Sequence, residues 1–91
     1  MEIQSLYKLK SKFVAREVGT ELIIVPLSGN VAQMNALFTL NETGKFIWDN
    51  ATDSNLIDDM VTLMTDEFDI DCQTARRDIE AFLQKLETTL A

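Results

Sequence analysis

The side chains that could do chemistry in this 91-residue sequence are mainly carboxylates. The acidic run over residues 66–71, DEFDID, offers four carboxylates as oxygen ligands for a metal ion. It lacks the glycine and the distal glutamate of an EF-hand loop. Acidic residues at helix ends are also explained by capping and by the helix dipole. We therefore interpret this run as solvent-exposed helix ends and expect no metal site.

Histidine and cysteine limit the reactions further. The sequence has no histidine, which is the usual general base near neutral pH, and no nucleophile–base pair is visible. Its one cysteine, Cys72, begins a predicted helix, where the helix dipole can lower a thiol pKa. Cys72 also falls on the apolar stripe of that helix, so we expect it to be buried and structural. A lone cysteine allows no internal disulfide and suits a reducing compartment. We expect a protein without enzymatic activity.

The basic residues of the sequence could instead indicate a binding function. After Lys45, the only basic residues are Arg76, Arg77 and Lys85, all on the last predicted helix. They could form surface pairs, such as Arg76 with Glu80 one helical turn away, or they could receive a carboxylate of a partner. The formal net charge is −7, and residues 41–91 hold 12 acidic and 4 basic side chains. Such a domain repels a phosphate backbone, so nucleic acid is not the expected partner.

The elements that would position these residues begin with strands. Residues 13–18 and 21–25 predict a tight hairpin through Gly19 and Thr20, and Pro26 ends its second strand. After a predicted turn at residues 28–30, residues 31–40 alternate in the manner of a half-buried strand at the edge of a sheet. One face would carry Ala32, Met34, Ala36, Phe38 and Leu40, and the other Val31, Gln33, Asn35, Leu37 and Thr39.

Three helices follow the strands. The first covers residues 41–51, with Asn41 as N-cap and an apolar stripe of Leu40, Gly44, Ile47, Trp48 and Ala51. The second runs from residue 54 or 55 to 68, with Asn55 and Asp58 as a capping box. The third follows Asp71, and its stripe is Cys72, Ala75, Ile79, Phe82, Leu83, Leu86 and Leu90.

Residues 1–12 have no apolar core segment, because lysines interrupt their apolar residues. We expect a loosely ordered N-terminal arm there, with no signal peptide. No apolar run is long enough to span a membrane, so we expect a cytoplasmic protein without a membrane partner. The predicted fold is α+β: a three-stranded antiparallel sheet followed by three helices (βββααα).

The predicted edge strand is the clearest binding feature. Its unpaired backbone N–H and C=O groups can accept an extended peptide as a further strand. The same edge could instead be covered, or it could pair with a second copy in a homodimer. The sequence leaves these three alternatives open.

The nonapeptide LNETGKFIW, residues 40–48, resembles the signature of PqqD-like proteins, the family of pyrroloquinoline-quinone synthesis protein D. FVARE and LIIV upstream are similar to that family's opening hairpin, and residues 57–71 and 75–86 are similar to its last two helices, so the likeness covers about residues 13–88. The resemblance implies a winged-helix-like fold and one peptide-recognition domain over residues 13–91. It implies a RiPP recognition element, which is a peptide chaperone of natural product biosynthesis. Such a chaperone binds the leader of a ribosomally made precursor peptide and presents it to a modifying enzyme, commonly a radical SAM enzyme, without catalysis or cofactor.

The resemblance also implies where the leader peptide binds. It would extend the sheet in a cleft between the third strand and the last helix. The residues that this assigns to peptide binding are Val31, Gln33, Met34, Asn35, Leu37 and Thr39, with the outward face of Arg76, Ile79, Glu80 and Leu83. Residues 50–53 lack the glycine often found after the family's first helix, and the sequence does not specify the pathway. The alternative function is a winged-helix nucleic-acid-binding or other protein-interaction module, since a fold does not determine function.

Overall fold

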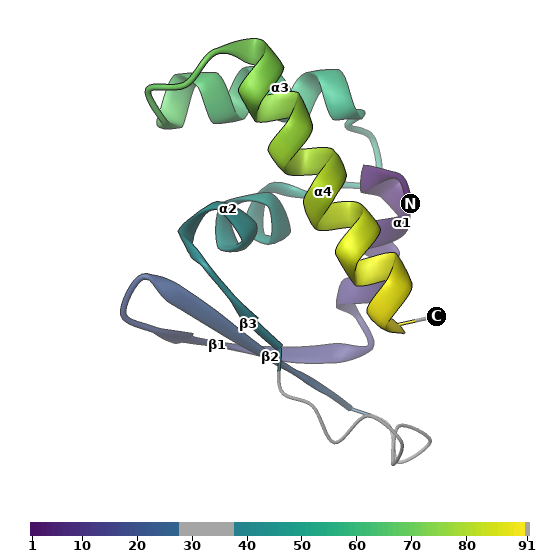
Figure 1. Ribbon diagram of the computed structural model, residues 1–91. Helices are drawn as coiled ribbons and strands as arrows, with labels where there is room; N and C mark the ends of the chain where they lie inside the picture. Colours follow the sequence, from purple (N-terminus) through teal and green to yellow (C-terminus); the bar gives the residue numbers. More distant parts are fainter. Residues whose placement is uncertain (28–37, 91) are drawn as a thin grey trace.

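The computed structural model describes residues 1–27 and 38–90 as a three-stranded antiparallel sheet with helices on one side (Figure 1). The described elements in chain order are α1 (Ile3–Lys10), β1 (Phe13–Val18), β2 (Glu21–Pro26), β3 (Phe38–Leu40), α2 (Glu42–Asn50), α3 (Ile57–Glu67) and α4 (Cys72–Leu90). The α+β prediction of a three-stranded antiparallel sheet followed by three helices is confirmed. The likeness to a winged helix stays a prediction.

The sheet is ordered β1-β2-β3, so β2 is its central strand. Gly19 in the β1–β2 turn has φ of 64°, a left-handed conformation that glycine adopts without steric cost. Leu22 and Ile24 of β2 are buried, and the register pairs Leu22 with Leu40 of β3. In β3, Leu40 is buried and Thr39 is exposed, which agrees with the predicted alternation. The predicted turn at 28–30 and the predicted strand residues 31–37 lie outside the described residues.

The N-terminal segment differs from the expected loose arm. Residues 3–10 form α1, in which Ile3 and Leu6 are 1% and 0% exposed. A helix this short is marginal on its own, so burial of these two side chains in the core is what stabilises it. The expectation of a loose arm was wrong because the lysines that interrupt the apolar residues, such as Lys8, lie on the exposed side of an amphipathic helix.

The helix starts follow local capping chemistry. Asn41 accepts a hydrogen bond from the Gly44 amide at 2.9 Å, which confirms the predicted N-cap of α2. The predicted start of α3 is wrong by two or three residues. Asn55 instead accepts from the Thr52 amide at 3.0 Å and so belongs to the loop. The cap is made where the Leu56 amide donates to the Asp59 carboxylate at 2.8 Å.

Helix α4 begins as predicted, because the Asp71 carboxylate accepts from the Thr74 amide at 2.7 Å. This bond lowers the pKa of Asp71, since it favours the charged carboxylate. Cys72 is exposed, so the prediction that it is buried was wrong. It is the first residue of the helix, and the buried stripe begins one turn later at Ala75.

The core lies between the sheet and the helices. Its buried members include Trp48 and Ile47 of α2, whose apolar stripe is confirmed, and the ring of Phe13 meets Trp48 edge-on with centroids 6.0 Å apart. Residues from α3 and α4 complete it: Met60, Val61, Met64, Ala75, Ile79, Leu83 and Leu86. Among the described residues, no helix has the length and apolar character needed to cross a bilayer.

Candidate functional site

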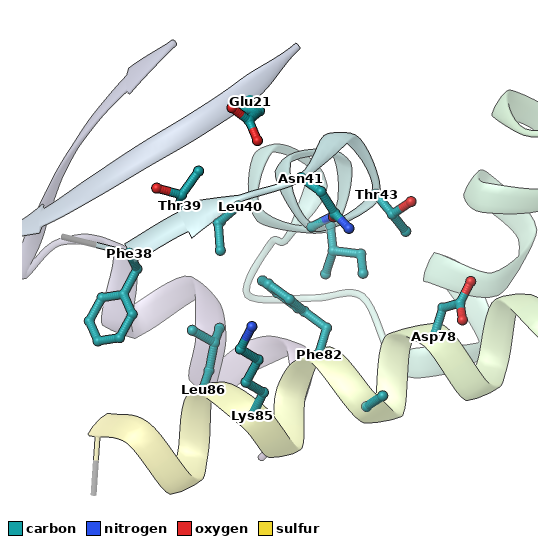
Figure 2. A pocket seen from close by; sticks show the side chains of 13 residues that line it. Glu21, Phe38, Thr39, Leu40, Asn41, Thr43, Asp78, Phe82, Lys85 and Leu86 are labelled. Carbon is teal, nitrogen blue, oxygen red and sulfur yellow. The ribbon is translucent and has the colours of Figure 1, made fainter. Parts of the chain in front are cut away.

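A groove of about 500 Å³ runs between β3 and α4 (Figure 2). One wall is the strand with the start of α2, and the other is one face of α4. The residues that line it are Glu21, Phe38, Thr39, Leu40, Asn41, Thr43, Gly44, Ile47, Asp78, Ala81, Phe82, Lys85 and Leu86. The sequence prediction of a cleft between the third strand and the last helix therefore matches a groove of the structure.

The two walls run in opposite directions along the groove. Figure 2 shows Phe38 of the strand wall near the Leu86 end of α4, and Thr43 toward the Asp78 end. Phe82 extends between them toward Leu40 and Asn41. The groove thus has an apolar end, where Phe38 and Leu86 lie, and a polar end, where Asp78 lies.

Gly44 makes room for one of these groove side chains. A Cβ added to Gly44 would lie 3.1 Å from Cε1 of Phe82 and 3.3 Å from Cβ of Leu40. Most Cβ atoms keep a wider distance from their neighbours, so the bare glycine lets the phenyl ring lie against the first turn of α2. The sequence placed Gly44 on the apolar stripe of this helix, and the structure supplies the neighbour that requires a small residue there.

The strand wall offers backbone groups as well as side chains. Among the described strands, β3 pairs only with β2, so one of its edges has no described strand partner. Backbone N–H and C=O groups along such an edge can receive an added strand. Thr39, which was assigned to binding from the sequence, is exposed on β3 and lines the groove.

The helix wall is a different face of α4 from the one predicted. Ile79 and Leu83 are 0% and 2% exposed and belong to the core, so the expectation that they face outward was wrong. Arg76 pairs with Asp58 of α3, a contact that raises the pKa of its guanidinium through the hydrogen bond and the opposite charge. Neither Arg76 nor Glu80 lines the groove.

None of the α4 residues that line the groove was assigned to peptide binding from the sequence; they are Asp78, Ala81, Phe82, Lys85 and Leu86. Phe82 and Leu86 were both placed on the buried stripe, but Phe82 is half-buried and reaches the groove, whereas Leu86 is buried and belongs to the core as well as to the groove wall. Ala81 lies off the predicted apolar stripe and next to Phe82, and this small side chain in the middle of a long helix was the available signal for a groove face. The other residues assigned from the sequence, Val31, Gln33, Met34, Asn35 and Leu37, lie outside the described residues.

The charges of the groove are carried by Glu21, Asp78 and Lys85. The Glu21 and Asp78 carboxylates are exposed, and neither has a hydrogen bond or ion pair within residues 1–27 and 38–90. Lys45, which does not line the groove, pairs with Glu17 at 3.4 Å and Asp49 at 3.8 Å. In the part of the chain that is described, no three side chains of metal-ligating type gather to hold an ion. The groove can therefore contact an extended chain segment through backbone hydrogen bonds, apolar side chains and charged side chains.

Comparison with known proteins gives two matches. Residues 21–89 match the model of the family described as coenzyme PQQ synthesis protein D (PqqD). Among solved structures, the chain is similar to TbiB1 in complex with the TbiA(beta) leader peptide, with a TM-score of 0.68 and 23% sequence identity. That match covers 85% of this chain and 84% of that one, and it shows a shared fold. No curated protein matches the chain.

Proposed function

The chain belongs to the coenzyme PQQ synthesis protein D family, and from this premise we propose that it binds the leader of a ribosomally made precursor peptide and presents it to a modifying enzyme. The observation that carries the proposal is the groove between β3 and α4, where an edge of β3 that has no strand partner among the described residues lies beside apolar side chains. The bound leader peptide of the TbiB1 structure supports it from a protein of the same fold.

In the proposed binding mode, the leader adds a strand beside β3. Main-chain hydrogen bonds to the strand edge supply affinity that is independent of sequence, and pockets for alternate side chains supply selectivity. Phe82 and Ala81 of α4 would contact those side chains of the bound leader that face the helix. The rest of the precursor stays outside the groove, where an enzyme can reach it.

The proposed contribution to modification is concentration and orientation. A leader held by this domain brings the attached peptide to the enzyme at a high effective concentration without any catalytic group on the domain itself. The proposal therefore assigns no catalysis to the chain. A radical SAM enzyme is the partner that the family resemblance suggests, and a reducing compartment such as the cytoplasm is the expected location.

The test is an amide titration of the ¹⁵N-labelled protein with the leader of the precursor encoded beside its gene. We expect the largest shifts at residues 38–44 and on the α4 face of Asp78, Ala81, Phe82, Lys85 and Leu86. Phe82→Ala should weaken binding, whereas Arg76→Ala, on the same helix but away from the groove, should leave it unchanged. Shifts centred on the Arg76 face, or no binding at all, would overturn the proposal.

The presenting role needs its own measurement. The modifying enzyme encoded with the precursor should convert it faster when the protein is added, and Phe82→Ala should remove most of that gain. A precursor without its leader should not respond to the protein. Conversion of the precursor by this protein alone would contradict the non-catalytic assignment.

A further inference from the structure

The two ends of the groove differ in chemistry, and each makes its own demand on a bound peptide. Phe38 and Leu86 lie at one end, and Phe82 continues this apolar surface toward the middle. The rings of Phe38 and Phe82 are only partly buried, so they offer apolar surface that a ligand side chain can cover. An aliphatic or aromatic side chain is the group that gains by burial there.

The other end carries negative charge that this chain does not neutralise within its described residues. Asp78 stands on the helix wall of this end, and Glu21 lies beyond β3 on the strand wall (Figure 2). Neither carboxylate has a partner in residues 1–27 and 38–90. Lys45 is held by Glu17 and Asp49. A lysine or arginine side chain on the peptide would supply the opposite charge.

From these observations, and resting on the proposed function, we propose that the groove selects extended peptide segments in which an apolar and a basic side chain lie about four residues apart. From Asp78 to Leu86, α4 rises about 12 Å at about 1.5 Å per residue. A strand covers that length in roughly four residues at about 3.3 Å each. Because side chains alternate along a strand, an even spacing of four puts both on the same face, toward α4.

The order of the two residues reports the direction of the added strand. The strand wall runs from Phe38 at the apolar end toward Asn41 and Thr43 at the polar end. A peptide antiparallel to β3 would therefore carry its basic residue first and its apolar residue four positions later. A parallel peptide would show the reverse order with the same spacing.

The experiment is a selection from a random twelve-residue mRNA-display library on the purified, immobilised protein. Asp78→Asn is the test variant, and Glu80→Gln is its control, because it removes the same charge from the same helix outside the groove. On the wild type and on Glu80→Gln, we expect enriched peptides with an apolar residue and a lysine or arginine four positions apart. On Asp78→Asn, we expect the apolar residue to persist and the basic preference to fall.

Binding measurements on one enriched peptide then show how much the basic residue contributes to affinity. Replacing its basic residue by glutamine should weaken binding about 2- to 5-fold on the wild type at low salt, as for one exposed ion pair. The same change should have little effect on Asp78→Asn, and on the wild type its effect should shrink in 0.5 M salt because exposed pairs are screened.

The outcomes separate this inference from the function that it builds on. If enriched peptides shift the groove amides but show no basic preference, the charge selection is refuted and peptide binding stands. A basic preference that persists on Asp78→Asn refutes the assignment of that selection to Asp78. A different spacing refutes the geometry. If no library peptide and no encoded leader shifts the groove amides, the proposed function fails together with the inference.

Discussion

Replacing Gly44 tests the packing that shapes the groove. A glycine costs about 1 kcal/mol relative to alanine inside a helix, so Gly44→Ala gains up to that amount. Against this, the new Cβ would lie 3.1 Å from Cε1 of Phe82, which must retreat by a few tenths of an ångström. A swing of roughly 10° provides this and stays far from the ~30° departure that costs about 0.5–1.5 kcal/mol. The contact with Cβ of Leu40, at 3.3 Å, adds a small backbone adjustment.

The gain is at least as large as these small costs, so we expect Gly44→Ala to leave the free energy of unfolding unchanged or to raise it by less than about 1 kcal/mol. Gly44→Leu adds three more carbons where only the ring can yield, and should lose about 1–3 kcal/mol through overpacking. Both values come from urea unfolding followed by the fluorescence of Trp48, which is 3% exposed in the folded protein and becomes solvated on unfolding.

A double-mutant cycle identifies the neighbour responsible. Phe82→Leu shortens the side chain that faces Gly44, so it should recover part of the loss in Gly44→Leu, with an interaction energy of about 0.5–3 kcal/mol. Arg76→Ala, on the same helix but paired with α3, should recover nothing. A Gly44→Leu protein as stable as the wild type would refute the argument, because the first turn of α2 would then be open. A loss that Phe82→Leu leaves unchanged would instead assign the constraint to Leu40.

Three further perturbations test the local causes of the fold. Asn41→Ala removes the acceptor of the Gly44 amide and should cost about 1 kcal/mol in urea unfolding, whereas Asn41→Asp, which still caps, should cost less. Leu6→Ala should cost about 2–5 kcal/mol because that side chain is 0% exposed, and the exposed Lys8→Ala on the same helix should change stability by less than about 0.5 kcal/mol; equal effects would mean that α1 is not part of the core. Hydrogen bonds from Thr74 lower the pKa of Asp71 in the folded state, so its contribution is present above the unfolded value near 3.8 and is lost as the pH falls through the lower folded pKa. Melting temperatures measured from pH 5 to pH 2 should therefore fall more for the wild type than for Asp71→Asn, which caps without titrating, and parallel curves would contradict this.

Periodicity and capping predicted most of the fold because both are local. The Asn41 and Asp71 caps and the stripe through Ile47 and Trp48 follow from residue types a few positions apart, and each is present in the structure. Helix α1 was missed because its amphipathic pattern is short and its stability comes from contacts distant in sequence. The exposure of Cys72, the first residue of α4, likewise depends on where the helix packs against its neighbours.

The site was predicted at the level of elements and missed at the level of side chains. The family resemblance implied a cleft between the third strand and the last helix, and a groove lies there. The apolar stripe predicted for the last helix already placed Ile79 and Leu83 among its buried residues, as they are in the structure. The error lay in assigning the same two residues to an outward binding face. Phe82, on the same stripe, is only half-buried because it faces the groove beside Gly44, a contact between residues distant in sequence that the stripe does not contain.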